Sequence, residues 1–227
     1  GLLDPEDPRS GLVAEGGAGQ RLELWDSTVE DNRRHGIDID DWVGILELHG
    51  STVTGNQQDG IRADGASLVV FEEVEVARNL AAGARLRSTV AEVWTSRFDN
   101  NLSAGLVVDG GFPAVEMSQF RGNGLQLTDV ASGSIRTNDF DNGTVGLLST
   151  RSAPEVVGNT FTGNITAMRV SGSPTPALIT GNTFVNNSTA IDNRSGTVLS
   201  ARKNYWGTTD STTIAGLFSG DVAFSQY

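Results

Sequence analysis

The sequence predicts an all-β solenoid in which about nine coils of about 22 residues each contribute three short strands. Three observations predict this fold class. A motif of the form Asn-x-Phe or Ser-x-Val returns along the chain. Apolar residues alternate with polar ones before and after each motif, and many of the 28 glycines fall between these runs. No helix of useful length fits between one repeat and the next, so the repeat itself is the structural unit.

The three-residue motif ends in an apolar residue that recurs about every 20–24 residues. Its first position is Asn in four downstream copies and Ser in four upstream copies, and Val74–Val76 fills the remaining place. The apolar members are Val29, Val53, Val76, Phe98, Phe120, Phe140, Phe161, Phe184 and Trp206. Equivalent residues of stacked coils lie about 4.8 Å apart. We therefore expect the aromatic members to form one internal stack.

An alternating run precedes each motif. Apolar residues stand three and five positions before the Asn or Ser, as Leu24 and Leu22 do in the first coil. Alternation with a period of two predicts a strand. Pro113, Gly133 and Pro154 occupy the earlier of the two positions in later coils. Because proline and glycine weaken a strand interior, we expect strands to start there.

A second alternating run follows each motif and reads Gly-Ile-x-Ile or a close variant. Its copies are residues 36–39, 60–63, 83–86, 105–108 and 124–127, and downstream it decays to Val145/Leu147 and Met168/Val170. Each coil therefore offers a third strand, whose inward residues face the core.

Two columns of asparagine mark the turns. We expect the first, the Asn or Ser of the motif, to form an inward ladder that satisfies buried turn backbone. The second column precedes the Gly-Ile-x-Ile run, and we interpret it as a turn position with left-handed backbone, which Asn tolerates. Its members are Asn32, Asn56, Asn79, Asn101, Asn123, Asn164 and Asn187.

A leucine-rich repeat is the competing solenoid, but it requires Leu at fixed offsets and one strand per repeat. The columns here mix Val, Ile, Phe and Ala over three strand-like runs. Over residues 11–207 the G-I-x-I strands and N-T-F turns resemble the pectate-lyase-like superfamily of right-handed parallel β-helices. The segment NYWGTTD at 204–210 is similar to the last coil of many secreted bacterial β-helix domains.

The resemblance implies a domain plan. It places a parallel β-helix over 11–207 and a C-terminal cap over 208–227, with Asp210 as the N-cap of a short helix over 214–218. Residues 1–10 would be a leader or the end of a truncated upstream region, so we expect the chain to be part of a longer protein.

Composition excludes several partners and chemistries. The net charge of −12, with only 16 Lys and Arg, disfavours binding to nucleic acid or to anionic membranes. No apolar run is long enough for membrane insertion. The absence of Cys excludes thiolate chemistry and disulfides. The sequence also contains no HExxH, EF-hand, P-loop or GxSxG motif.

The outward residues of the Gly-Ile-x-Ile strands form the first candidate site. They read Val13, Asp38, Arg62, Arg85, Val107, Gln126, Gly146, Arg169 and Asp192, and two residues further on Glu15, Asp40, Asp64, Arg87, Asp109 and Thr128. Active sites of the resembled superfamily lie on this face. We therefore expect a compact mixed-charge patch over three coils, with His35 at its entrance.

The segment Arg34–Ile39 is similar to the G-H-G-I-S-I segment of polygalacturonase-type glycoside hydrolases. Those enzymes also need an N-T-D segment and an Asp pair on preceding coils and an R-I-K segment afterwards, and none stands in the expected place. The pair Asp40-Asp41 follows His35 instead of preceding it. Only His35 is therefore a matched position.

The patch has three possible chemical uses. His35, Asp38, Asp40, Asp64 and Arg85 are the catalytic candidates, since paired carboxylates can serve as acid and base in glycoside cleavage. Arginines can grip a uronate carboxylate, which makes Arg62, Arg85 and Arg87 candidate substrate-binding residues. No metal or other cofactor is expected, although Asp40 with Asp64 could hold Ca²⁺. The plainer interpretation is cross-strand charge pairing, with Asp38 beside Arg62 and Asp64 beside Arg87.

A second outward column lies on the strand before the motif and reads Trp25, His49, Glu72, Trp94, Glu116 and Arg136. Exposed tryptophan can stack on sugar rings, so Trp25 and Trp94 are further candidate substrate-binding residues. They stand three coils apart. His49 alone is interpreted as a surface residue.

Two functions follow. The first is a secreted or surface β-helix domain, bacterial in origin, that acts as a non-catalytic scaffold or carbohydrate-binding module with a polysaccharide as partner. The second is a polysaccharide-active enzyme (a hydrolase, polyuronate lyase or epimerase) that uses the charged patch. Coils of about 20–24 residues leave little chain for the walls of a catalytic cleft, which favours the first.

Overall fold

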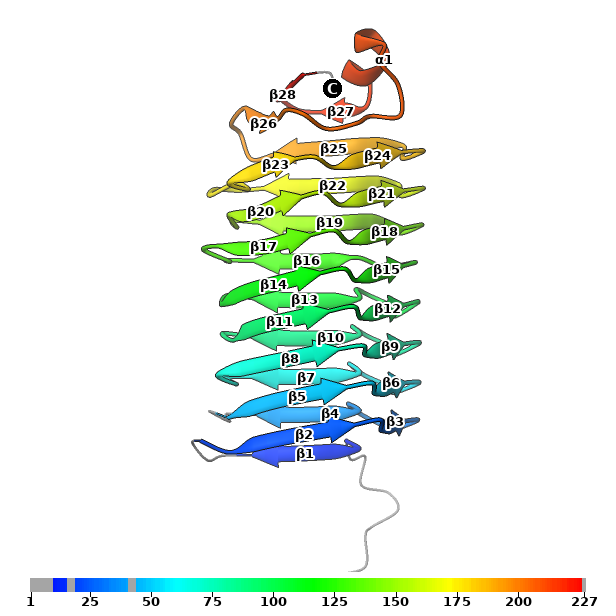
Figure 1. Cartoon of the computed structure of the whole chain (residues 1–227), viewed down its shortest axis with the longest axis vertical. Helices are drawn as coiled ribbons and strands as arrows, with labels where there is room; N and C mark the ends of the chain where they lie inside the picture. Colours follow the sequence, from blue (N-terminus) through cyan, green and yellow to red (C-terminus); the bar gives the residue numbers. More distant parts are fainter. Residues whose placement is uncertain (1–9, 16–18, 41–43, 226–227) are drawn as a thin grey trace, which may run out of the picture.

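A computed structural model describes residues 10–15, 19–40 and 44–225. The chain forms an elongated rod of stacked coils, with all strands of each sheet parallel and running around the rod axis (Figure 1). Each regular coil contributes one strand to each of three sheets, here called sheets A, B and C. The predicted all-β parallel solenoid of about nine coils is confirmed.

Sheet A contains the Gly-Ile-x-Ile strands and has ten members. They are β1 (Leu12–Glu15), β4 (Ile37–Asp40), β7 (Ile61–Asp64), β10 (Ala84–Arg87), β13 (Leu106–Asp109), β16 (Leu125–Thr128), β19 (Val145–Thr150), β22 (Thr166–Ser171), β25 (Thr189–Arg194) and β27 (Phe218–Ser219). Inward residues within the stack, such as Ile37 and Ile39, are fully buried because alternate side chains point into the rod, whereas Leu12 of the terminal strand β1 is partly buried.

Sheet B contains the strands that precede the three-residue motif, and it has eight members. They are β2 (Arg21–Trp25), β5 (Ile45–His49), β8 (Leu68–Glu72), β11 (Val90–Trp94), β14 (Phe112–Glu116), β17 (Gly133–Arg136), β20 (Pro154–Val157) and β23 (Leu178–Thr180). As expected from their sequence, β17 starts at Gly133 and β20 at Pro154, while Pro113 is the second residue of β14.

Sheet C contains the motif itself, in eight strands of three residues. They are β3 (Thr28–Glu30), β6 (Thr52–Thr54), β9 (Glu75–Ala77), β12 (Arg97–Asp99), β15 (Gln119–Arg121), β18 (Asp139–Asp141), β21 (Thr160–Thr162) and β24 (Thr183–Val185). Their central residues point inward and fill one corner of the core.

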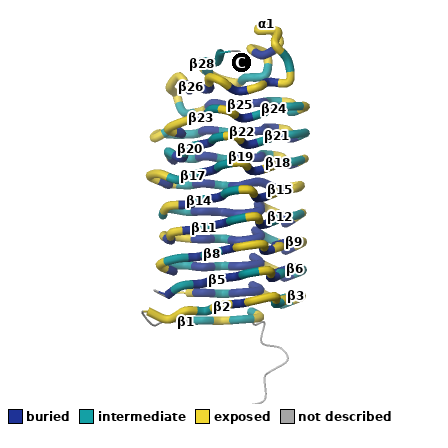
Figure 2. The backbone as a smooth tube through the Cα atoms, viewed as in Figure 1, coloured by how far each residue is buried: buried dark blue, intermediate teal, exposed yellow. Residues whose placement is uncertain are grey.

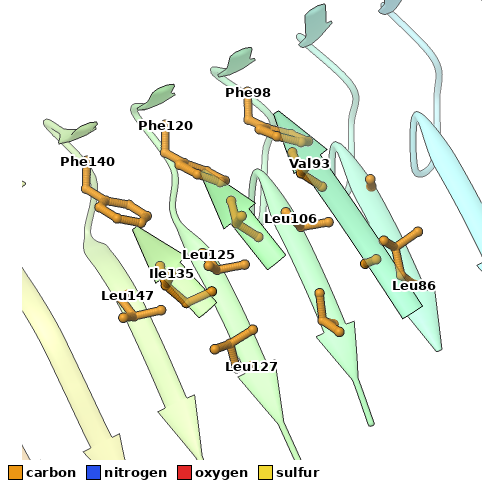
Figure 3. Packing of buried hydrophobic residues seen from close by; sticks show 14 of the residues in the cluster. Leu86, Val93, Phe98, Leu106, Phe120, Leu125, Leu127, Ile135, Phe140 and Leu147 are labelled. Carbon is orange, nitrogen blue, oxygen red and sulfur yellow. The ribbon is translucent and has the colours of Figure 1, made fainter. Parts of the chain in front are cut away.

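The inward side chains of the three sheets form one continuous core along the rod. Figure 2 shows buried residues in every layer of the stack, and Figure 3 shows part of the core around Phe98, Phe120 and Phe140. The predicted aromatic stack runs through the core without interruption. Successive rings from Phe98 to Trp206 lie 4.7–4.9 Å apart and within 4–12° of parallel. Ring spacing therefore follows the strand spacing, and each ring is covered on both faces by its neighbours.

The motif asparagines form the predicted ladder. Asn159 Nδ2 donates to Asn182 Oδ1 at 3.0 Å and to the carbonyl of Ile135 at 2.8 Å, while Oδ1 of each Asn accepts the backbone N–H of the Asn one coil earlier. Asn159 and Asn182 are 1% exposed. Upstream, Ser96 Oγ takes the same place by accepting the N–H of Val74.

The second asparagine column has a different role from the one predicted. The left-handed backbone falls one residue earlier, for example at Asp31 and Asn100. The column itself is a second inward ladder, in which Asn56 Nδ2 donates to Asn79 Oδ1 at 2.9 Å. The prediction was wrong because Asn suits both a left-handed turn and a buried ladder, and sequence spacing alone does not separate adjacent positions.

Two register details also differ from the sequence prediction. Leu125 pairs with Leu147, not with Val145, so the inward pair of that coil is Leu147 and Ser149. In the outward column, Leu148 takes the place predicted for Gly146. The cause is β19, which is six residues long and starts before the level at which β16 begins.

The C-terminal residues cover the end of the rod (Figure 1). β27 pairs with β25, and β28 (Val222–Phe224) pairs with β26 (Leu199–Ala201). Helix α1 comprises Ser211–Ala215, and Asp210 caps it by accepting the N–H of Thr213 at 2.9 Å. The cap residue was predicted, but the helix starts three residues before the predicted 214, because it begins directly after its cap.

Candidate functional site

The turns that lead into β4, β7, β10 and β13 fold over the outer face of sheet A. The residue just before each turn glycine is buried, and these four residues, called here the turn overhang, are His35, Asp59, Ala82 and Ala104. Ala82 and Ala104 pack with Val107, an outward residue of β13 that is only 8% exposed, in a small apolar cluster of their own. The overhang therefore shields the first part of the sheet A face from water.

His35 is a buried titratable group of the overhang whose Nδ1 lacks a hydrogen-bond partner in the described part of the chain. Its side chain is 10% exposed, and its Nδ1 lies 3.9 Å from Asp59 Oδ2, too far for a hydrogen bond. Burial lowers the pKa of His35, and the nearby carboxylates of Asp38 and Asp59 offset this only in part. The imidazole is accordingly neutral at neutral pH.

Asp59 is a site residue that the sequence analysis missed. Its carboxylate is 7% exposed, accepts the N–H of Ala82 at 2.8 Å, and accepts Arg85 Nε at 3.1 Å. A signal was available, since Asp59 stands one coil after His35 at the same distance from the turn glycine. Strand alternation does not extend into turns, so this position was left out of the predicted patch.

The predicted charge pairs form along the sheet A face. Arg62 bridges Asp38 Oδ1 at 3.3 Å and Asp40 Oδ1 at 3.5 Å. The second oxygen of Asp38 accepts the hydroxyl of Ser10 at 3.2 Å. One coil further, Arg87 lies 3.7 Å from Asp64 on one side and 3.7 Å from Asp109 on the other. Each arginine is therefore neutralised by carboxylates of neighbouring coils.

The structure thus brings most of the sheet A candidates onto one face, where they form separate Asp–Arg ion pairs instead of one shared site. Arg85, placed with the uronate-binding arginines, is engaged by Asp59. Asp40 and Asp64, the weak Ca²⁺ candidates, contact different arginines. No group of three or more His, Asp or Glu side chains in the described ranges is placed to hold a metal ion. Asp41 and residues 1–9 lie outside the described residues, as do the side chain of Glu15 and residues 226–227.

Sheet B carries a separate cluster around Trp25. The indole is 58% exposed, and its ring stacks on the imidazole of His49 with centroids 4.0 Å apart and planes at 12°. Its Nε1 donates to Glu23 at 3.1 Å. His49 lies on the outer face as expected, and its Nδ1 lies 3.0 Å from Glu72 Oε2. Its side chain is only 15% exposed. Trp94 lies three coils further along the same face and is half-buried.

The geometry defines a parallel β-solenoid with two polar surface clusters. Residues 40–205 match the family described as the right-handed beta helix region, and the chain belongs to this family. Comparison with curated proteins and with solved structures finds no match. In the described segments, no helix is long and apolar enough to cross a membrane. The fold supports a structural or polysaccharide-related domain in general.

Proposed function

We propose that this chain is a non-catalytic carbohydrate-binding domain, which uses the rod as a rigid scaffold and the outer face of sheet B as its binding surface. We further propose that it acts outside the cell or on the cell surface of a bacterium, with a polysaccharide as its partner. Nucleic acid is not part of the proposal, since the net charge of −12 opposes contact with phosphate groups. Membrane insertion is not part of it either, since the sequence contains no apolar run of the length that a span needs.

The observation that carries the proposal is the fixed orientation of Trp25. An exposed indole normally rotates freely, but here one ring face rests on His49 and the ring nitrogen is bonded to Glu23. A preformed aromatic platform loses little entropy when a sugar ring stacks on it. The carboxylate of Glu72 and the guanidinium of Arg21 lie on the same sheet face and can bond sugar hydroxyls.

Trp94 extends this surface along the rod. It shares the outward column of Trp25, and its register partners are Glu72 and Glu116. The two tryptophans are three coils apart, or about 14 Å at the usual strand spacing. An extended glycan that follows the rod axis could therefore contact both rings.

The test is a binding measurement on a glycan array, followed by titration of each glycan that binds. We expect Trp25→Ala to weaken binding about tenfold or more, equivalent to about 1.4 kcal/mol. Tyr205→Ala is the matched control, because Tyr205 is a 44% exposed aromatic residue that pairs with Thr183 of sheet C, away from the proposed binding surface. Equal affinity of Trp25→Ala and the wild-type chain for every glycan that binds would contradict the proposal. Titrations repeated with added Ca²⁺ and with EDTA test whether glycan affinity depends on Ca²⁺, for which Asp40 and Asp64 are the candidate ligands.

Polysaccharide cleavage is the second candidate function, and one observation favours it. His35 has an unpartnered Nδ1 beside two aspartates in a shielded position, and buried titratable groups of this kind cluster at active sites. The surrounding ion pairs weigh against it, because Asp38 and Asp59 are already bonded to Arg62 and Arg85.

A further inference from the structure

The turn at the corner between sheets C and A is shortest in one coil, the one that links β15 to β16. Asn101 and Leu106 are five positions apart, as are the equivalent residues of the three preceding coils, whereas Asn123 and Leu125 are only two positions apart. The turn between β15 and β16 therefore lacks the residues that form the turn overhang in earlier coils. Gln126, the outward residue of β16, is not covered as Val107 is.

The shortened turn leaves a recess of about 310 Å³, called here the corner notch. Leu102 and Ser103 of the preceding turn form one wall, and Thr144, Val145 and Leu148 form the other. Asn123, Gly124 and Gln126 lie between them. Volumes from about 300 Å³ upward are typical of small-molecule sites.

The second asparagine ladder is interrupted at the same place. Upstream, Asn32, Asn56 and Asn79 direct their backbone N–H groups to the Asn of the next coil, as Asn79 does to Asn101 at 3.1 Å. After Asn123 the next position is Gly143, which has no side chain to accept this bond. In the described part of the chain, the N–H of Asn123 has no acceptor.

The amide of Asn123 is turned relative to the rest of the ladder. Its Oδ1 lies nearest Gly105, in the place that Nδ2 of Asn101 occupies beside Gly83. A half-turn of the amide would direct Oδ1 to the N–H of Asn101 and Nδ2 to the carbonyl of Phe98, as in other ladder members. The backbone N–H of Asn123 is then the group that still lacks a partner.

The notch is polar but uncharged. The hydroxyls of Ser103 and Thr144 and the amide of Gln126 make no hydrogen bond within the described chain. Leu102, 75% exposed, and Leu148 supply apolar contacts. No lining residue is charged. Uncharged hydrogen-bonding groups beside apolar walls match the hydroxyls and C–H faces of a neutral sugar ring, and they give no reason to bind a carboxylate or an amine.

We propose that the corner notch is a second saccharide site that takes one uncharged sugar unit, with Ser103, Gln126 and Thr144 as its hydrogen-bonding groups. The choice of a sugar as ligand rests on the proposed function. The location rests on two departures from the repeat, the shortened turn and the ladder gap, which coincide with the notch. Departures of this kind from an otherwise consistent pattern are expected at functional positions.

The experiment is a titration of the ¹⁵N-labelled chain with neutral gluco-, manno- and xylo-hexasaccharides, with hexagalacturonate as the charged comparison. The Trp25→Ala background removes the sheet B platform. We expect a neutral hexasaccharide to shift the amide signals of Asn123 and Gln126, and hexagalacturonate to leave them in place. Gln126→Ala should weaken the fitted affinity about three- to tenfold, as loss of a hydrogen bond does, and Ser103→Arg should abolish it by filling the notch. The matched control is Gln58→Ala, because Gln58 is an exposed turn glutamine that lies two coils from Ser103 and three from Gln126.

Gly143→Asn gives a test that does not depend on loss of structure. The introduced amide would accept the N–H of Asn123 inside the rod, so we expect a chain that is more stable and whose sugar affinity is unchanged, since Gly143 does not line the notch. Shifts confined to Trp25 and its neighbours in the chain with intact Trp25 would overturn the notch site while leaving the proposed function in place. Shifts at the notch with unchanged affinity in Trp25→Ala would support the notch and contradict the sheet B platform.

Discussion

At the scale of the single residue, stability is concentrated in the aromatic stack. Phe120 is fully buried, with Phe98 and Phe140 each 4.9 Å away on either face. We expect Phe120→Ala to reduce the free energy of unfolding by about 3–5 kcal/mol, because neighbouring rings held by their own coils cannot close the cavity. Urea denaturation measures this. Phe112→Ala, on the surface, is the control, and similar losses for both variants would contradict the buried stack.

His35 should make stability depend on pH. Burial lowers the folded-state pKa of His35 below its ordinary value near 6.5. The unfolded chain therefore binds a proton more readily than the folded chain. Stability is full above the ordinary pKa and falls as pH drops from about 6.5 toward the folded pKa. Asp38 and Asp59 reduce this effect, while Arg62 and Arg34 increase it.

The measurement compares the free energy of unfolding at pH 7.5 and pH 5.5 in the wild-type chain and in His35→Gln. We expect a smaller loss on acidification in the variant, since glutamine does not titrate. His49→Gln controls for the other histidine. An identical loss in wild type and His35→Gln would show that other groups cause the acid sensitivity.

At the scale of the element, the ladders hold the turns. Asn182 donates to Asn204 and to the carbonyl of Val156, and its Oδ1 accepts from Asn159. We expect Asn182→Leu to reduce the free energy of unfolding by about 1–3 kcal/mol, because it leaves buried backbone groups without partners. A denaturation midpoint equal to that of the wild type would count against the ladder.

Filling the gap in the second ladder is predicted to increase the free energy of unfolding, in contrast to the loss expected for Asn182→Leu. Gly143 has ordinary backbone geometry, and a Cβ placed on it would lie 3.1 Å from the carbonyl oxygen of Asn123 and 3.2 Å from Asn164 Oδ1. Gly143→Asn should therefore fit with a small shift and add about 1 kcal/mol by completing the ladder. Gly124→Ala is the contrast, since its Cβ would meet the carbonyl of Val145 at 2.1 Å. A stability loss in both variants would refute the predicted gain.

The elements show why the sequence predicted the strands better than the turns. Inward strand residues alternate with outward ones along a strand, and the same residue type recurs at the equivalent position of successive coils. Phe140 and Asn159 could therefore be placed from sequence spacing alone. The length and path of a turn leave no such pattern. The register at Leu147, the burial of His35 and the role of Asp59 all depend on turn paths, and each was missed or misplaced. Pair formation at Asp38 and Arg62 was predictable because both lie in strands.

At the scale of the whole molecule, charge is arranged to hold coils together. Asp38, Asp59 and Asp64 each pair with an arginine one coil further along sheet A. These ion pairs link one coil to the next along the rod axis. Along this axis each coil of a solenoid contacts only its two neighbours. Cross-coil ion pairing is therefore sufficient to explain why charged residues gather on the outer face of sheet A, without a catalytic role.

The final prediction is that the chain shows no turnover of pectin, polygalacturonate or alginate. Acid–base cleavage needs one group that donates a proton and a second that accepts one. The carboxylates of Asp38, Asp40, Asp59 and Asp64 pair with Arg62, Arg85 and Arg87. The lowered pKa of His35 leaves its imidazole uncharged at neutral pH, so it is not the imidazolium that could protonate a leaving group. A Ca²⁺-dependent lyase needs a basic residue instead of a carboxylic acid, so the assay must be run with and without Ca²⁺. Unsaturated-product absorbance and reducing ends are both followed. Turnover that disappears in Asp40→Ala and Arg85→Ala would replace the binding function with an enzymatic one.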